Sequence, residues 1–181
     1  SAVAVFGASL DSLPRQARGV LRLHGPDTSR FLQGTVSANL VPAPEGEAIA
    51  ATLLTVKAKI VSELIVLVRA EDTIDVLIPS DVFEAVESLL DRHIIMDEVE
   101  LERRDDAVAV LWGEGAAALE LPPEVEGWRC EHPVRGVLCV GPRAAVQAVV
   151  DTTTVGDADA FARHRVEHGL PAWGFELAPD F

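Results

Sequence analysis

Basic residues are scarce in this sequence of 181 residues. Lysine and arginine together number 15, against 29 aspartates and glutamates, which gives a formal net charge of −14 at pH 7. A protein that binds nucleic acid or an anionic membrane mainly through charge needs a basic face. The composition therefore argues against direct nucleic-acid binding and against electrostatic membrane docking by this chain.

Cysteine is also scarce, and long apolar runs are missing. The two cysteines, Cys130 and Cys139, cannot form a disulfide framework, so we expect a reducing, cytoplasmic environment. Apolar runs such as 48–54 and 65–68 end well short of the roughly 18 to 20 residues that a membrane-spanning helix needs. No basic segment followed by a long apolar one marks a secretory signal at the start. The 49% of apolar residues nevertheless suffice for a folded core.

The sequence does contain a mixed series of strands and short helices. Alternating or β-branched apolar residues predict strands, and apolar stripes at helical spacing predict helices. The predicted strands cover 19–23, 48–56, 60–69, 73–78, 98–103, 107–112 and 134–140. The predicted helices begin near Asp27 and Asp81 and cover 143–150 and 158–168, the last one closed by Gly169. This order favours an α+β fold, with antiparallel and mixed sheets and inserted helices, over a regular βαβ array.

One motif is similar to a dinucleotide-binding turn. Residues 113–118 (GEGAAA) directly follow a predicted strand and match the G-x-G-x-x-A pattern. Such a turn must open a long helix, but Pro122 and Pro123 stop any helix after about two turns. We therefore interpret the segment as a plain loop.

A second motif has metal-ligand spacing. Residues 164–168 (HRVEH) match the H-x-x-E-H spacing of some zinc proteases. Such a site needs a third protein ligand, and the only carboxylates after His168 are Glu176 and Asp180. We therefore interpret this segment as an exposed polar helix face and predict no metal site.

The two cysteines flank a predicted β-hairpin. With a turn centred on Val134 and Arg135, the cysteines would lie opposite each other on its two strands. Two thiols and His132 fall short of a closed zinc site, so we predict reduced, partly buried thiols.

Four stretches, in order, resemble the folate-binding family that contains the glycine-cleavage T-protein, an aminomethyltransferase, and the YgfZ-type proteins. Residues 21–40 resemble the family's opening strand and "FLQG" helix, and 53–60 (LLTVKAKI) resemble its "LLTPKGKI" hairpin. Residues 75–79 (DVLIP) lead into an amphipathic helix as in the family, and 165–177 (RVEHGLPAWGFEL) are close to its "RI..GIP..G.EL" pattern. Together the four stretches span nearly the whole chain.

The resemblance also implies a domain organisation. We expect two interlocked α+β subdomains, one formed by 1–47 with 141–181 and the other a ferredoxin-like middle part, 48–140. In the family a C-terminal barrel and the YgfZ-type "KGCYxGQE" segment would lie downstream of Phe181. We therefore expect the chain to be the N-terminal region of such a protein.

The resemblance implies tetrahydrofolate as the cofactor. In T-proteins the glutamate of "R-L-E-A-G" contacts the pterin ring, and this glutamate falls on Glu167. A carboxylate can accept two hydrogen bonds from the amino and ring N–H groups of a pterin. Ser62 and Glu63 fall on two adjacent aspartates of the T-protein hairpin, one of which lies at the folate nitrogen that accepts the one-carbon unit. Arg165, two residues before Glu167 on a helix, is expected to be structural.

Departures from the T-protein pattern indicate which branch the chain resembles. Ser62 and Glu63 replace the two aspartates, and Pro79 replaces an asparagine. Ala58 replaces the turn glycine, so a positive φ at this position would be strained. These changes argue against aminomethyl transfer and favour the YgfZ-like branch.

The YgfZ-like branch implies a non-catalytic, folate-dependent accessory factor in iron–sulfur cluster assembly or repair, linked in some members to tRNA modification. Iron–sulfur client proteins would be its partners, and no catalytic residue is predicted. Two alternatives stay open. One is an aminomethyltransferase-like enzyme in which Glu63 stands in for the missing aspartate, and the other is a scaffold that has lost its ligand.

Overall fold

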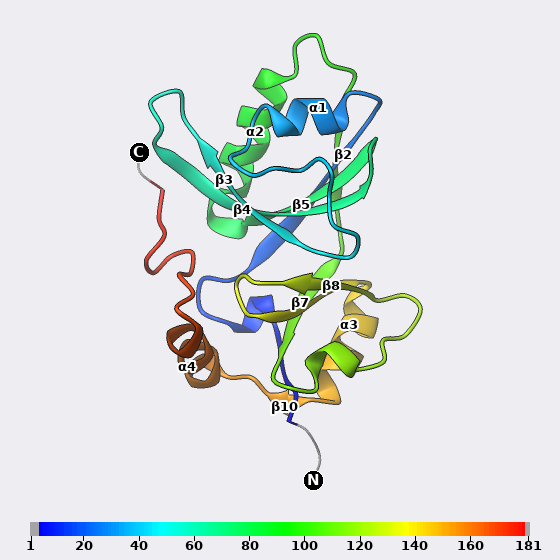
Figure 1. The fold of residues 1–181 in the computed structure, drawn as a ribbon, viewed down its shortest axis with the longest axis vertical. Helices are drawn as coiled ribbons and strands as arrows, with labels where there is room; N and C mark the ends of the chain where they lie inside the picture. The colour runs from blue at the N-terminus through cyan, green and yellow to red at the C-terminus, as the bar shows by residue number, and fades with distance from the viewer. Residues whose placement is uncertain (1–3, 180–181) are drawn as a thin grey trace. The chain divides into compact units, whose positions relative to one another are not determined.

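The computed structural model describes residues 4–179, which divide into two compact units (Figure 1). Unit 1 comprises 4–17 and Asp105–Glu176. Unit 2 comprises Arg18–Arg104 and 177–179. Each unit has its own five-stranded sheet and is described by itself.

Unit 2 is built on an antiparallel sheet with the strand order β3-β4-β5-β2-β6. The strands are β2 (Arg18–His24), β3 (Ile49–Leu54), β4 (Ile60–Ala70), β5 (Thr73–Pro79) and β6 (Glu100–Arg104). Its helices are α1 (Thr28–Gln33), the 3-10 turn η2 (Ser80–Val82) and α2 (Phe83–His93). Figure 1 shows α1 and α2 on one side of this sheet.

The two faces of the unit 2 sheet differ in chemistry, because successive strand residues point to opposite faces. On the face covered by the helices, Gly19 lies directly beneath the ring of Phe83, and Leu21 is completely buried. The opposite face carries charge: Arg22 and Asp75 lie across from each other in the register of β2 and β5. Charged side chains that are buried on the face of a sheet must be paired with groups of opposite charge.

Unit 1 has a mixed sheet with the strand order β10-β1-β7-β9-β8. The strands are β1 (Phe6–Ser9), β7 (Ala107–Trp112), β8 (Glu126–Cys130), β9 (Gly136–Gly141) and β10 (Thr154–Val155). Strands β1 and β10 are parallel and the other pairs are antiparallel. The helices are α3 (Arg143–Asp151) and α4 (Ala158–His168), with the 3-10 turns η1 (Leu10–Ser12) and η3 (Ala116–Ala118).

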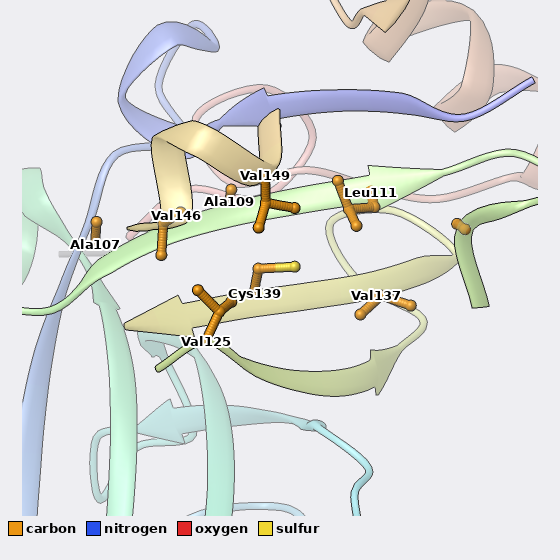
Figure 2. Close-up of a cluster of buried hydrophobic side chains, with 9 residues drawn as sticks. Ala107, Ala109, Leu111, Val125, Val137, Cys139, Val146 and Val149 are labelled. Carbon is orange, nitrogen blue, oxygen red and sulfur yellow. The ribbon is translucent and has the colours of Figure 1, made fainter. Parts of the chain in front are cut away.

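Helices pack on both faces of the unit 1 sheet. Figure 2 shows the core on one face, where Val146 and Val149 of α3 lie over Ala109 and Leu111 of β7. The next residue along β7, Trp112, points to the opposite face and packs edge-on against Phe161 of α4, with 6.4 Å between ring centroids. Strand β7 thus fixes the position of α4 in unit 1.

The expected fold class is confirmed: the chain is α+β with antiparallel and mixed sheets. The unit boundaries differ from the expected division into 1–47 with 141–181 and 48–140. The reason is strand pairing, because β2 pairs with β5 and β6 inside unit 2, whereas β7, β8 and β9 form the sheet of unit 1. Strands β1 and β10 were not predicted. Within residues 4–179 no helix is both long and apolar enough to cross a bilayer.

The hairpin of β8 and β9 corrects the prediction that its cysteines face each other. Cys139 lies opposite Gly127, and Cys130 lies opposite Gly136. The loop 131–135 centres the turn closer to the N-terminus than predicted, so the register is shifted. Both thiols are free and buried, and burial raises the pKa of each to about 12. They are therefore protonated and unreactive at neutral pH.

Candidate functional site

Helix α4 presents one polar face to a pocket in unit 1. The helix starts at Asp157, whose side chain accepts a hydrogen bond from the Ala160 amide at 2.8 Å, and ends at Gly169, whose φ of 64° is left-handed. Both ends were predicted. Residues three and four apart share a helix face, and the face that lines the pocket consists of Ala160, Arg163, His164, Glu167 and His168.

The pocket has a volume of about 560 Å³. Its remaining lining comes from β1, from the end of β7 and from the loop before β9: Phe6, Trp112, Gly113, Glu114 and Arg135. This volume falls inside the range of about 300–1,000 Å³ that is usual for small-molecule sites. The pocket combines aromatic walls with charged groups of both signs.

Four rings form a continuous run along the pocket wall. Phe6 stacks on Trp112 with 5.9 Å between centroids and 16° between planes. Trp112 lies 5.9 Å from the ring of His164, which in turn lies 4.2 Å from that of His168. Trp112 and His164 are buried, so the ring surface that this wall offers to a flat heterocycle comes from Phe6 and His168.

His164 is a buried, neutral member of this run. Its Nε2 accepts a hydrogen bond from the backbone N–H of Arg135 at 3.0 Å, so Nε2 carries no proton. Burial, reinforced by the charges of His168 and Arg135 and opposed by Glu167, lowers the pKa of His164. His164 thereby ties α4 to the β8–β9 loop.

The histidine pair corrects the interpretation of 164–168 as a fully exposed face, because His164 is buried beside Trp112. His168 is exposed, and its Nδ1 donates to the carbonyl oxygen of His164 at 2.9 Å. The Nε2 of His164 is occupied by the Arg135 amide and is not free to bind a metal. Residues 4–179 contain no group of three His, Cys, Asp or Glu side chains placed to hold a metal ion.

Glu167 and Arg163 are the charged groups of α4 that face the pocket, and both are exposed. Neither forms an ion pair with any residue in the range 4–179, and no ion pair joins them to each other. Arg135, by contrast, donates to Glu131 at 2.8 Å. The pocket therefore holds a free carboxylate and a free guanidinium on adjacent turns of a single helix. Glu114, beyond the end of β7, is a second exposed carboxylate of the pocket without an ion pair among residues 4–179.

Arg165 is structural, as the sequence suggested. It is buried, and its guanidinium donates to Glu176 at 2.9 Å and to the carbonyl oxygen of Leu170 at 3.3 Å. It also lies over the rings of Phe161 and Phe175, at 5.5 and 5.0 Å from their centroids. These contacts fasten the segment after α4 to the helix.

The other two predicted site residues, Ser62 and Glu63, lie on β4 in unit 2. Ser62 is completely buried, and its hydroxyl donates to the carbonyl oxygen of Glu63 at 2.7 Å. Glu63 accepts a hydrogen bond from Arg18 at 3.0 Å, and the Arg18 side chain is only 1% exposed. As neighbours in one strand, the two side chains point to opposite faces of the sheet. Within unit 2 they do not form one ligand-binding set.

The structure also settles the conformation of two other sequence features, Ala58 and the glycine motif at 113–118. Ala58 adopts a φ of 59°, so the β3–β4 turn keeps the left-handed conformation without glycine, at a cost in strain. The glycine motif at 113–118 forms no long helix: Gly113 has a φ of 104°, and only the short turn η3 follows. The loop interpretation of this motif is confirmed.

Sequence reasoning missed most of the pocket. Trp112 had been assigned only to a strand, and Arg135 and Arg163 had no assigned role. The one available signal was the helical spacing of Arg163 and Glu167, four residues apart on a face whose apolar content is low.

Comparisons with known proteins support the fold. No protein-family model and no curated protein sequence matches this chain. Among solved structures it is similar to the glycine cleavage system aminomethyltransferase T of Bartonella henselae, with a TM-score of 0.78 and 17% identity. That match covers 98% of this chain and 54% of the other, so the chain spans about half the length of that protein.

A second similar structure is the heterotetrameric sarcosine oxidase of Corynebacterium sp. U-96, in complex with pyrrole 2-carboxylate. The TM-score is 0.50 and the identity 17%, over 90% of this chain and 85% of that one. At these identities the likenesses concern the fold alone. The chain has the aminomethyltransferase T fold.

Proposed function

We propose that this chain binds tetrahydrofolate and that the Glu167 carboxylate recognises the pterin ring. One observation carries the proposal: Glu167 is exposed on the wall of a pocket of about 560 Å³, next to a run of aromatic rings, with no ion-pair partner among residues 4–179. An unpaired carboxylate can accept two hydrogen bonds from a pterin's N–H groups, and the accessible rings of Phe6 and His168 can stack on the pterin plane. The resemblance to folate-binding proteins at the same residue supports this.

The role that fits best is that of a YgfZ-like accessory protein of the cytoplasm, without catalysis by this chain. It would serve the assembly or repair of iron–sulfur proteins, or tRNA modification, with iron–sulfur proteins as partners. The two positions that carry aspartates in T-proteins support this view, since Ser62 is buried and Glu63 is bonded to Arg18. Because the net charge is −14, contact with tRNA would depend on other parts of the complex.

The alternative is an aminomethyltransferase-like enzyme, and the likeness to aminomethyltransferase T favours it. Glu63 would then have to act at the one-carbon centre, but its carboxylate accepts a hydrogen bond from the buried Arg18. Formation of methylene-tetrahydrofolate from an aminomethylated carrier protein would establish the enzyme. If the chain binds folate tightly but no methylene-tetrahydrofolate forms, the accessory role is favoured over the enzyme.

The folate proposal is tested by thermal unfolding with and without tetrahydrofolate. A ligand at about 100 times its dissociation constant adds roughly 2.7 kcal/mol to the free energy of unfolding. For a chain of this size that raises Tm by about 5 to 10 °C, since 1 kcal/mol shifts Tm by about 2 to 4 °C. We expect the shift in the wild type and its loss in Glu167→Gln, which removes the charge and keeps the shape.

A matched control is Asp159→Asn, which removes one exposed carboxylate from the same helix outside the pocket. It should keep the full shift. An equal shift in the wild type and Glu167→Gln would show that Glu167 is not the pterin contact. No shift in any variant would favour the scaffold that has lost its ligand.

A further inference from the structure

Arg163 differs from the other arginines of unit 1 because it has no ion pair, side-chain hydrogen bond or ring contact among the described residues. Arg15 also lacks an ion pair, but it donates to the carbonyl oxygen of Gly174 and lies over the ring of Phe175. Arg143, Arg135 and Arg165 each form an ion pair, with Asp11, Glu131 and Glu176 respectively. Arg163 forms none within the described part of the chain, although Glu167 lies one helical turn further along. An arginine that precedes a glutamate by four residues is the less favourable order for a helical ion pair. The two groups thus stay separately available on the pocket wall.

The two side chains offer complementary halves of a hydrogen-bonding pattern. A guanidinium only donates hydrogen bonds, and a carboxylate only accepts them. The ligand edge that satisfies both has a carbonyl oxygen directly beside two N–H donors. A pterin has this edge: the 4-oxo oxygen, the N3–H and the 2-amino group lie in a row.

We infer that Arg163 and Glu167 together read the 2-amino-4-oxo edge of the ligand's ring. Glu167 accepts from the N3–H and the 2-amino group, and Arg163 donates to the 4-oxo oxygen. The inference rests on the proposed function and adds a specificity-determining residue to it. A ring with an amino group at position 4 presents a donor to Arg163, which can only donate, so the pair discriminates between 4-oxo and 4-amino rings.

The same edge occurs in guanine, whose O6, N1–H and 2-amino group have the same order. The aromatic side chains do not select between the two ring systems, because the accessible rings of Phe6 and His168 can stack on any flat heterocycle. The shared chemistry is therefore a cyclic acylguanidine, and the source is decided by experiment. The proposed function selects the pterin.

The test measures dissociation constants by isothermal titration under anaerobic conditions. The probes are tetrahydrofolate, its 4-amino analogue and guanosine, each titrated into the wild type, Arg163→Ala, Arg163→Lys and Glu167→Gln. We expect Arg163→Ala to shift the ratio of 4-oxo to 4-amino affinity by about tenfold or more towards the 4-amino ring, and Arg163→Lys to retain most of the wild-type ratio. Glu167→Gln should weaken tetrahydrofolate by about tenfold or more.

The matched control is Arg92→Ala, which removes an exposed arginine from α2 in unit 2 and should leave every constant unchanged. Circular dichroism confirms that each variant is folded. The inference is overturned if Arg163→Ala weakens the 4-oxo and 4-amino rings equally, or changes neither.

The outcomes separate the inference from the proposed function. If tetrahydrofolate binds and Glu167→Gln weakens it while Arg163→Ala does not alter the ratio, the function stands and the inference fails. If only guanosine binds, and both Arg163→Ala and Glu167→Gln weaken it, the inference stands and the folate function fails. If no probe binds the wild type, both fail.

Discussion

The sheet of unit 2 and the pocket of unit 1 use charge in opposite ways. In unit 2 the carboxylate of Asp75 is completely buried and receives hydrogen bonds from Arg22, at 2.8 and 3.1 Å, and from Arg69, at 2.6 Å. In unit 1 Arg163 and Glu167 are exposed in a pocket and unpaired within the described residues. A buried charge must be paired for the chain to fold, whereas an unpaired charge in a pocket is available to a ligand.

The same comparison can be made for Glu63, which the family resemblance predicts to be a site residue. Its carboxylate accepts a hydrogen bond from Arg18, and the side chains are only 11% and 1% exposed. Glu63 therefore resembles Asp75 more than Glu167. Pairing and exposure, rather than residue type, separate the charges that hold the fold from those that can hold a ligand.

The largest effect is expected from breaking the paired cluster with Asp75→Asn. Burial alone would raise the pKa of Asp75, but the hydrogen bonds and charges of Arg22 and Arg69 outweigh burial and hold the pKa below its usual value. The substitution removes the carboxylate charge that the half-buried guanidinium groups of Arg22 and Arg69 share. We expect the free energy of unfolding to fall by about 3 kcal/mol, measured by urea denaturation at pH 7.

The control for this variant is Asp11→Asn, at the exposed pair formed with Arg143. Exposed ion pairs contribute about 1 kcal/mol or less to the free energy of unfolding, so this substitution should lower it by no more than that. The structural role of the Asp75 cluster would be refuted by equal, small losses in the two variants.

Features that depend on nearby residues could be predicted from the sequence, whereas features that depend on contacts between distant segments could not. The ends of α4 were predictable because Asp157 and Gly169 cap it locally. The pocket was not, because Trp112 and Arg135 reach α4 only through the register of the unit 1 sheet. Glu167 became a candidate through a family resemblance, whereas the only local signal for Arg163 is its position four residues before Glu167.

As ligand contacts, Ser62 and Glu63 stay predictions that rest on the family resemblance. Neighbours in a strand face opposite sides of the sheet, so the two could not serve as one pair of contacts within unit 2. This follows from the prediction of a strand over 60–69, because successive strand residues point to opposite faces. The ion pair between Glu63 and Arg18 was not predictable, because it joins β4 to a strand more than forty residues earlier in the chain.

An intermediate effect is expected from protonating His164, a titratable group that is buried within unit 1. Its pKa is lower in the folded state than the unperturbed value of about 6.5, chiefly because of burial. Its contribution to stability is thus complete above pH 6.5 and is lost as the pH falls through the folded-state pKa. We expect the wild type to lose about 1 kcal/mol over this range, because protonated Nε2 no longer accepts from the Arg135 amide.

The measurement is the free energy of unfolding between pH 7.5 and 5 for the wild type and His164→Gln. Glutamine can still accept a hydrogen bond but does not titrate. The loss of unfolding free energy that His164 causes at low pH should therefore be absent in His164→Gln. His93→Gln, at an exposed histidine of α2, should retain it. An unchanged decline in His164→Gln would assign the pH dependence to other groups.

The smallest effect is expected at the pocket charges. Glu167 lies in the last turn of α4, where the helix dipole disfavours a negative charge, so Glu167→Gln should leave the stability unchanged or raise it by a few tenths of a kcal/mol. Arg163→Ala should change it by about 0.5 kcal/mol or less, measured by urea denaturation without ligand. A loss above about 1 kcal/mol in either variant would place that residue with Asp75 among the charges that hold the fold. A small effect in both variants would agree with a role in binding, because an exposed charge in a pocket is available to a ligand.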